Sequence, residues 1–195
     1  MSLDTKQRIL SVGEELVCTK SFHSVGLSEI LTAANVPKGS FYHYFPSKEA
    51  FGVELIRYYN ETNSTKWSRM MEPHTGLKPL ERLLAALEVQ MAMYAEHGCR
   101  QSCLLVKLAA EVSQLSEPMR LEVVRVLNSW REMWENIVRE GQESGDIRSD
   151  LPAVTLTSFI QAAWLGAGIR AHVEQGASAL RAIKDAIQGY LTAHR

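Results

Sequence analysis

One short stretch of the sequence combines cationic, hydroxyl and imidazole side chains and contains no acidic residue between positions 35 and 48. It covers residues 36–51 and reads VPKGSFYHYFPSKEAF. Such side chains can bind phosphate oxygens and base edges, and a glycine among them lets another molecule approach the backbone closely. These residue types indicate a surface that contacts nucleic acid. The residues that we expect on this surface are Ser28, Lys38, Gly39, Ser40, Tyr42, His43 and Lys48.

A cysteine is the second candidate for chemistry. Residues 98–120 read GCRQSCLLVKLAAEVSQLSEPMR, and Cys103 is predicted to lie in the first turn of a helix near Lys107 and Arg100. Free N–H groups and nearby cations favour the thiolate, which is the reactive form of the side chain. We therefore interpret Cys103 as a candidate sensor thiol, and the alternative is a small buried hydrophobe. Cys99 is a candidate resolving thiol only if the segment between the two cysteines is helical or tightly turned.

The remaining polar residues show no pattern typical of an enzyme or a metal site. The sequence lacks a His-Glu-x-x-His motif, a nucleotide-binding glycine loop and a Gly-x-Ser-x-Gly motif. We therefore expect no enzyme activity, no bound metal and no cofactor. The histidines, which lack the spacing of metal ligands, are His23, His43, His74, His97, His172 and His194.

The elements that position these residues are predicted to be helices. Apolar residues recur at the three- and four-residue spacing of one helix face, and strand-like alternation is almost absent. Together with the glycine- and proline-containing breaks between these segments, this spacing predicts an all-α fold of about nine helices. Two amphipathic examples are Leu80, Leu84, Leu87, Met91 and Tyr94, and then Met119, Val123, Val126, Trp130, Met133 and Ile137.

The first three helices are predicted to form a helix-turn-helix DNA-binding domain over residues 1–47. Ser28 is a favourable N-cap, residues 35–36 suit a tight turn, and Pro37 suits the first turn of the next helix. A longer helix capped by Ser47 is expected to begin the helical sensing and dimerisation domain, residues 48–195. The aromatic side chains are expected to be scaffold: Phe41, Tyr44 and Phe45 should pack against Ile9, Val12, Leu16 and Ile30.

The second domain carries candidates for a ligand pocket and for a dimer interface. Aromatic and methionine side chains at helical spacing are typical of a core, and the alternative is that they line a cavity. The segment 153–169 is apolar nearly all round, so it needs a partner on both sides, and a second subunit would supply one. The candidate pocket residues are Met91, Tyr94, Trp130, Met133, Trp134, Trp164 and His172. The candidate interface residues are Phe159, Gly166, Ile183, Ile187 and Leu191.

Bulk properties restrict the function less than the motifs do. The chain has 195 residues, 46% of them hydrophobic, and a net charge of −1, so a phosphate-binding surface would have to be local. The segment 153–169 falls short of the roughly 20 apolar residues of a membrane span. Three unevenly placed cysteines and the lack of an apolar signal segment predict a cytoplasmic protein with reduced thiols.

Residues 25–51, VGLSEILTAANVPKGSFYHYFPSKEAF, resemble the DNA-binding domain of the TetR family of bacterial repressors. The resemblance implies a homodimer with a variable ligand-binding C-terminal domain. From the expected two-fold symmetry we predict that two reading helices meet a near-palindromic operator in double-stranded DNA. The sequence SCLLVKL also resembles a branch that includes repressors of N-ethylmaleimide and aldehyde-detoxifying reductases, in which a cysteine at the position of Cys103 begins a helix.

The combined reading is a DNA-binding repressor that an electrophile, an oxidant or a small apolar ligand releases from its operator. Within it we assign Tyr42 and Lys48 to phosphate, and Ser40 and His43 to base edges. The alternative is a repressor that responds only to a reversibly bound small molecule, with Cys103 structural. A constitutive architectural helical bundle is a third option, and it would not lose DNA affinity when an effector arrives.

Overall fold

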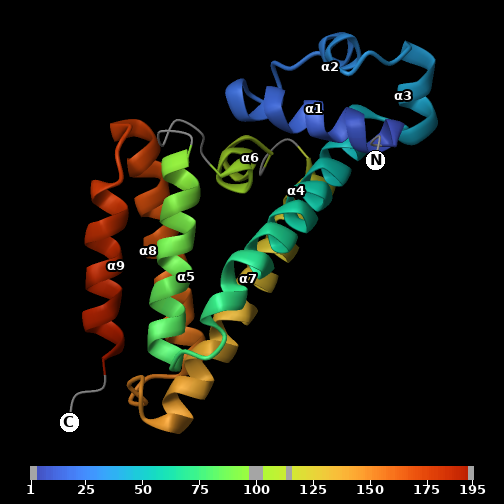
Figure 1. The fold of residues 1–195 in the computed structure, drawn as a ribbon. Helices are drawn as coiled ribbons and strands as arrows, with labels where there is room; N and C mark the ends of the chain where they lie inside the picture. Colours follow the sequence, from blue (N-terminus) through green and yellow to red (C-terminus); the bar gives the residue numbers. More distant parts are fainter. Residues whose placement is uncertain (1–3, 97–102, 113–115, 193–195) are drawn as a thin grey trace. The chain divides into compact units, whose positions relative to one another are not determined.

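The computed structural model describes residues 4–96, 103–112 and 116–192. In this part of the chain it contains nine α-helices, one short 3-10 helix and an isolated bridge between Ile147 and Thr192 (Figure 1). The predicted all-α fold is therefore confirmed. The helices are α1 Thr5–Thr19, α2 Leu27–Ala33, α3 Lys38–Tyr44, α4 Lys48–Met71, η1 Glu72–His74, α5 Pro79–Glu96, α6 Leu104–Val112, α7 Glu117–Ser144, α8 Ala153–Glu174 and α9 Ser178–Leu191.

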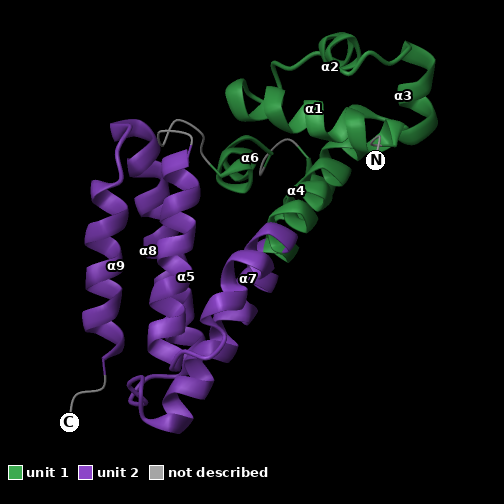
Figure 2. Cartoon of the chain, in the orientation of Figure 1, with its two compact units in different colours: residues 1–64, 103–126 green, residues 65–102, 127–195 purple. Residues whose placement is uncertain are grey.

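The chain divides into two compact units, which Figure 2 shows in green and purple. Unit 1 comprises residues 1–64 and 103–126, and unit 2 comprises residues 65–102 and 127–195. The division falls within α4 and within α7, so unit 1 joins the first three helices to α6 and to parts of two longer helices. The proposed domain boundary after residue 47 stays a prediction.

An aromatic cluster forms the centre of the first three helices. Phe41 of α3 and Phe45, which directly follows α3, are fully buried, and their rings lie 5.7 and 5.2 Å from the ring of Phe51 at the start of α4. Ile9 of α1 is also fully buried. A Cβ atom at Gly13 of α1 would lie 2.5 Å from the Phe51 ring, so α1 packs directly on this cluster. Burying each of these rings contributes about 2 kcal/mol to the stability of the fold. The aromatic side chains on the inner side of α3 therefore anchor this short helix.

The helix ends discussed here agree with those predicted from the sequence, with one correction. Helix α2 begins at Leu27, with extended Gly26 at the N-cap, so Ser28 lies inside the helix and does not cap it as predicted. The backbone explains this, because the carbonyl of Gly26 already accepts the first helical hydrogen bonds. Asn35 has a φ of 51° and turns the chain between α2 and α3. The predicted cap by Ser47 is confirmed, since its Oγ accepts from the N–H of Ala50 at 3.0 Å.

Unit 2 is a helical bundle around a second apolar core. Helix α9 contacts both α5 and α8 (Figure 1). The carboxylate of Asp146 accepts a 2.7 Å hydrogen bond from the N–H of Leu80, which satisfies a free donor in the first turn of α5. No helix in the described residues is long and apolar enough to cross a membrane. The buried core includes Leu83, Leu87, Trp134, Val138, Leu156, Ile160, Trp164, Leu180, Ile187 and Leu191.

Candidate nucleic-acid interface and candidate sensor thiol

The outer side of α3 collects most of the predicted DNA-contacting residues. Lys38, Gly39 and His43 are exposed, and Ser40 is half-buried. Tyr42 is 53% exposed, and its ring meets the buried Phe41 ring edge-on at 5.5 Å. The inner aromatics therefore fix the outer side chains on a short, well-anchored helix. The structure brings these predicted residues together on one surface, which we call the α3 face: Lys38, Gly39, Ser40, Tyr42 and His43.

Gly39 has no packing role inside its own chain. A Cβ atom at this position would meet no other atom within 4 Å. Glycine in a helix costs about 1 kcal/mol relative to alanine, so the absence of a side chain here is not explained by internal crowding. A surface that another molecule approaches closely would explain it.

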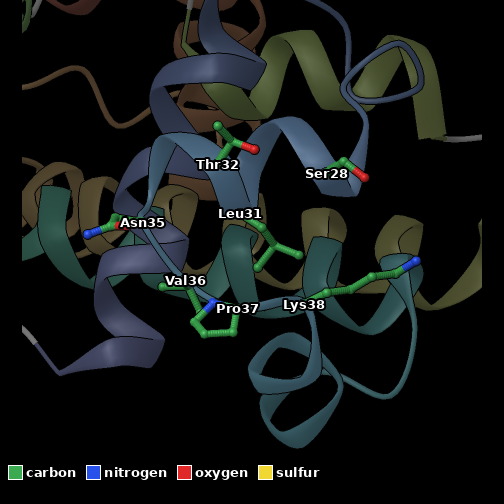
Figure 3. A pocket seen from close by; sticks show the side chains of 7 residues that line it. All are labelled: Ser28, Leu31, Thr32, Asn35, Val36, Pro37 and Lys38. Carbon is green, nitrogen blue, oxygen red and sulfur yellow. The ribbon is translucent and has the colours of Figure 1, made fainter.

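An open hollow lies between α2 and α3, next to the α3 face (Figure 3). Ser28 and Lys38, which were both predicted as DNA contacts, line it from opposite helices. Thr32 and Asn35 also line it, and they were not predicted. The sequence held a signal for them, because residues 28, 32 and 35 follow the four- and three-residue spacing of one helix side. The hollow is lined by Ser28, Leu31, Thr32, Asn35, Val36, Pro37 and Lys38.

The charges around this surface leave a cation available. The acidic residue of α2, Glu29, forms an ion pair with Lys20. Glu49, in the first turn of α4, accepts a 2.7 Å hydrogen bond from the Ser116 hydroxyl. Within the described residues, Lys38 has no acidic partner. A phosphate could therefore bind its ammonium without displacing an ion pair.

Lys48 makes structural contacts that were not predicted. Its Nζ donates to the carbonyl oxygens of Val25 at 2.6 Å and His23 at 3.1 Å, and it lies 5.2 Å from the centre of the Phe22 ring. Burial lowers the pKa of this ammonium, and the charge of Glu111 partly opposes that effect. These contacts use two of the three donors of the ammonium and fasten the loop between α1 and α2. The phosphate contact predicted for Lys48 stays a prediction.

Cys103 lies immediately before α6, one residue outside the first turn where it was predicted. Its side chain is half-buried, and its Sγ accepts a hydrogen bond from the Tyr59 hydroxyl of α4 at 3.4 Å. Its carbonyl oxygen accepts from the N–H of Lys107 at 3.1 Å, which starts the hydrogen bonding of α6. The other two residues of this prediction, Cys99 and Arg100, lie outside the described residues.

Helix α6 also holds the end of α1 and the loop that follows it. The Lys107 ammonium, expected near the Cys103 thiol, donates to the carbonyl oxygen of Cys18 at 2.9 Å. Glu111 accepts from the N–H of His23 at 3.4 Å. Burial, with a smaller contribution from the charge of Glu14, raises the pKa of the Cys18 thiol to about 11. Cys18 is therefore protonated and poorly nucleophilic at neutral pH.

The candidate pocket residues all belong to unit 2, and they differ in burial. Trp134 and Trp164 are buried in the core, whereas Met133 is exposed. Met91 and Tyr94 are partly buried against the core, and Trp130 and His172 are half-buried. The set therefore does not form one surface, and a role as pocket lining stays a prediction for its members.

The candidate interface residues also divide into two groups. Phe159 and Gly166 of α8 are exposed, so another chain can contact them. Ile187 and Leu191 of α9 are fully buried in the core of their own unit, and Ile183 packs against that core. Ile187 and Leu191 are therefore corrected from interface to core, because their own chain covers them completely. The interface role of Ile183, which is only partly buried, stays a prediction.

Comparison with known proteins covers both parts of the chain. Residues 9–55 match the family model described as bacterial regulatory proteins, tetR family, and residues 79–187 match the tetracyclin repressor-like C-terminal domain. The chain is 33% identical to the HTH-type transcriptional repressor NemR of Escherichia coli K12 over 172 residues, 88% of this chain and 86% of NemR. It is 35% identical to the transcriptional regulator AcuR of Cereibacter sphaeroides over 171 residues, 86% of this chain and 76% of AcuR.

Solved structures agree over nearly the whole chain. A regulatory protein TetR from Rhodobacter sphaeroides superposes with a TM-score of 0.87 at 32% identity, covering 95% of this chain and 98% of that one. The reduced form of Escherichia coli NemR superposes with a TM-score of 0.86 at 30% identity, covering 97% and 98%. Both neighbours are regulatory proteins, and neither is an enzyme.

Proposed function

The chain belongs to the TetR family of bacterial regulatory proteins and is a DNA-binding transcriptional repressor, and we propose that modification of Cys103 by an electrophile or oxidant releases it from its operator. The relatives are transcriptional regulators, so we assign no enzyme activity. A bacterial repressor works where the chromosome lies, which supports a cytoplasmic location. The observation that carries the sensor proposal is the position of Cys103 between Tyr59 of α4 and the start of α6.

The α3 face is the proposed reading surface. Lys38 and Tyr42 bind phosphate, while Ser40 and His43 contact base edges in the major groove. Gly39 lets the DNA backbone approach the helix closely. The proposal is supported by the exposure of these residues and by the unpaired cation of Lys38. The DNA-binding domain is residues 1–47, and the sensing and dimerisation domain is residues 48–195.

A homodimer through α8 is the proposed assembly, supported by one exposed stripe. The residues of this stripe are separated by three, four, three and four positions along the sequence. This is the spacing of a helix face that packs on a second helix. They are apolar or small and all exposed, although the other side of α8 is buried in the core. A second copy would cover this stripe and place two α3 faces on a near-palindromic operator. We call it the α8 seam: Phe159, Ala162, Gly166, Ile169 and Val173.

The proposed signal runs from the thiol to the DNA-binding helices through α6. In the reaction with N-ethylmaleimide, the Cys103 thiolate adds to the ring C=C bond, a C–S bond forms, and a proton from water completes the adjacent carbon. The added group takes space beside Tyr59 at this half-buried site, and we infer that α6 moves to make room for it. Because Lys107 and Glu111 connect α6 to the end of α1 and its loop, that movement displaces the reading surface.

A mobility-shift assay with the full-length protein tests this sequence of events. Wild type treated with N-ethylmaleimide should release operator DNA, and Cys103→Ser should retain it. Cys18→Ser and Cys99→Ser serve as matched controls and should release as wild type does, since the high pKa of Cys18 leaves little thiolate there. Equal release by Cys103→Ser and wild type would contradict thiol sensing and leave reversible ligand binding as the trigger.

A further inference from the structure

Two cysteines from distant parts of the sequence belong to unit 1, which is green in Figure 2. Cys18 lies near the end of α1, and Cys103 directly precedes α6. Both are free thiols, and both are half-buried. The proposed reaction with an electrophile uses Cys103 alone and leaves the thiol of Cys18 without a role.

The side of α6 that continues from Cys103 contacts the end of α1. Positions 103, 107 and 111 are spaced by four, so they line up along the helix. The Lys107 ammonium donates to the carbonyl oxygen of Cys18 itself at 2.9 Å, and Glu111 accepts from the N–H of His23 at 3.4 Å. Cys103 comes one turn before the lysine that contacts Cys18. The two cysteines therefore take part in the same contact between α1 and α6.

The electrostatics of Cys18 agree with this placement. Burial is the largest cause that raises the pKa of Cys18 to about 11. Next come the charge of Glu14, which raises this pKa, that of Lys107, which lowers it, and that of Cys103, which raises it. Charges act on one another strongly only over short distances in a protein surrounded by water and salt. The effect of Cys103 on Cys18 therefore indicates that the two sulfur atoms lie near each other.

The surroundings give the two thiols different chemistry. The thiolate is the form that attacks an oxidant, and Cys18 is almost wholly protonated at neutral pH. Cys103 lies at the start of a helix, whose free N–H groups attract negative charge, and its Sγ accepts a hydrogen bond from the Tyr59 hydroxyl at 3.4 Å. We therefore expect an oxidant to attack Cys103 first, while Cys18 stays reduced beside it.

We propose that a hydroperoxide joins Cys103 to Cys18 in an intramolecular disulfide. The Cys103 thiolate attacks one peroxide oxygen, so an S–O bond forms and the O–O bond breaks. The sulfur is oxidised to a sulfenic acid, and the peroxide is reduced to an alcohol or water that takes its proton from solvent. The Cys18 sulfur then attacks the Cys103 sulfur, the S–O bond breaks, and the thiol proton leaves with the hydroxyl group as water.

The disulfide changes the contact that connects α6 to the DNA-binding helices. It holds the two sulfur atoms at about 2.05 Å and the two Cα atoms within about 7 Å. Forming it takes the Cys103 sulfur away from the Tyr59 hydroxyl and changes the position of Lys107 at the Cys18 carbonyl. The regulatory role of the disulfide rests on the proposed function, because this displacement then releases the operator. Unlike alkylation, the change is reversed by a thiol reductant.

Tryptic mapping of the full-length protein tests the disulfide directly. Cleavage after lysine and arginine places Cys18 in ILSVGEELVCTK, residues 9–20, and Cys103 in QSCLLVK, residues 101–107. Cys99 falls in a third peptide, which ends at Arg100. After treatment with hydrogen peroxide and alkylation of the remaining thiols, mass spectrometry should find the first two peptides joined at their summed mass less two hydrogens. The matched control Cys99→Ser should give the same joined pair.

Operator binding measures the reversibility. After release by hydrogen peroxide, Cys99→Ser should regain operator binding when dithiothreitol is added. The double variant Cys18→Ser, Cys99→Ser should not regain it, because Cys103 without a partner is oxidised further to a sulfinic acid that thiols do not reduce.

The outcomes separate the disulfide from the proposed function. Absence of the joined pair, or a pair that joins Cys103 to Cys99 instead, overturns the disulfide even if N-ethylmaleimide releases the operator. Recovery of the double variant as complete as that of Cys99→Ser overturns it as well. A joined pair with unchanged operator affinity supports the disulfide and contradicts the thiol mechanism of the proposed function.

Discussion

Helices α3 and α8 each bury one side in their own compact unit, and they differ in what the other side offers. The outer side of α3 carries Lys38, Tyr42 and His43, whose polar atoms can bind phosphates and bases. The outer side of α8 carries Phe159 and Ile169, which have little to offer except apolar area. Under the proposed function, the difference corresponds to two kinds of partner, DNA for α3 and a second copy of the chain for α8.

The same comparison explains why both exposed sides contain a glycine. A Cβ atom would meet nothing within 4 Å at either Gly39 or Gly166. Neither glycine is therefore required by its own unit, and each leaves its helix backbone open to the partner. We propose that this partner is the DNA backbone on α3 and another helix on α8.

The largest effect is expected from charges in the α8 seam. Phe159→Glu with Ile169→Glu should weaken dimerisation more than about 1,000-fold, because burying unpaired carboxylates in an apolar interface costs several kcal/mol. Both residues are exposed, so the helical circular dichroism should be retained. Sedimentation should show a monomer at micromolar concentration, and operator affinity should collapse with it.

Asn136→Glu is the matched control for that prediction, since Asn136 is exposed on α7 and is not part of the α8 seam. It should sediment like wild type. A dimer that survives both seam substitutions would refute the proposed interface.

The next effect is expected at Gly39. Gly39→Leu should reduce operator affinity by about 100-fold or more, as its side chain blocks close approach to DNA. Gly39→Ala should raise the free energy of unfolding by about 0.5–1 kcal/mol and still weaken DNA binding. Denaturant unfolding and a mobility-shift assay measure the two properties. Full operator affinity in Gly39→Leu would show that α3 does not face DNA closely at this residue.

Substitution of Lys48 tests whether this lysine stabilises the fold or contacts DNA. Lys48→Met should lower the free energy of unfolding by about 2 kcal/mol, because the carbonyl oxygens of His23 and Val25 lose their donor. The salt dependence of DNA binding should change little, since two of the three donors of the ammonium already bind carbonyl oxygens. A reduced salt slope with unchanged stability would support the phosphate contact instead.

A smaller effect is expected when single side chains of the α3 face are removed. Lys38→Ala and Tyr42→Ala should weaken binding about five- to tenfold across all DNA sequences, and Lys38→Ala should lower the salt slope by about one. His43→Ala and Ser40→Ala should instead relax base preference at individual operator positions. Binding measured on an operator library at several salt concentrations distinguishes the two classes.

The smallest effect concerns acid stability in unit 1. The hydrogen bond from Lys6 at 2.6 Å is the main cause that lowers the pKa of Glu54. A lowered carboxyl pKa gives stability that is present at neutral pH and is lost as the pH falls through the folded pKa, below roughly pH 4. Glu54→Gln should therefore cost less than about 1 kcal/mol at pH 7 and less at pH 3 than at pH 7. Equal losses at both pH values would assign the effect to packing.

Local sequence signals predicted the parts of the fold that depend on neighbours in the chain. The spacing of Phe41 and Phe45 indicated the buried side of α3, and Ser47 indicated the start of α4. Ser28 misled because a preceding glycine in extended conformation supplied the N-cap position instead. Such a choice depends on backbone geometry that residue type only weakly favours.

Contacts between distant segments were not predictable in the same way. The apolar spacing of α9 identified a buried side, but it could not tell whether Ile187 meets its own chain or a second one. Lys48 and Lys107 have long flexible side chains, and their partners are carbonyl oxygens 23 and 89 residues away. A sequence pattern does not show which carbonyl a lysine reaches, because the fold decides which loop comes close.

The contact of α6 with the end of α1 has a consequence for how such repressors diverge. On the α1 side it uses backbone atoms, the carbonyl oxygen of Cys18 and the N–H of His23. Every residue type at position 18 has this carbonyl oxygen, and every residue type except proline at position 23 has this N–H. Substitutions in α3 that change the preferred operator sequence therefore leave the contact between α6 and the end of α1 intact. One sensing helix can serve descendants that read different DNA, and new regulatory circuits can arise by changing the reading residues alone.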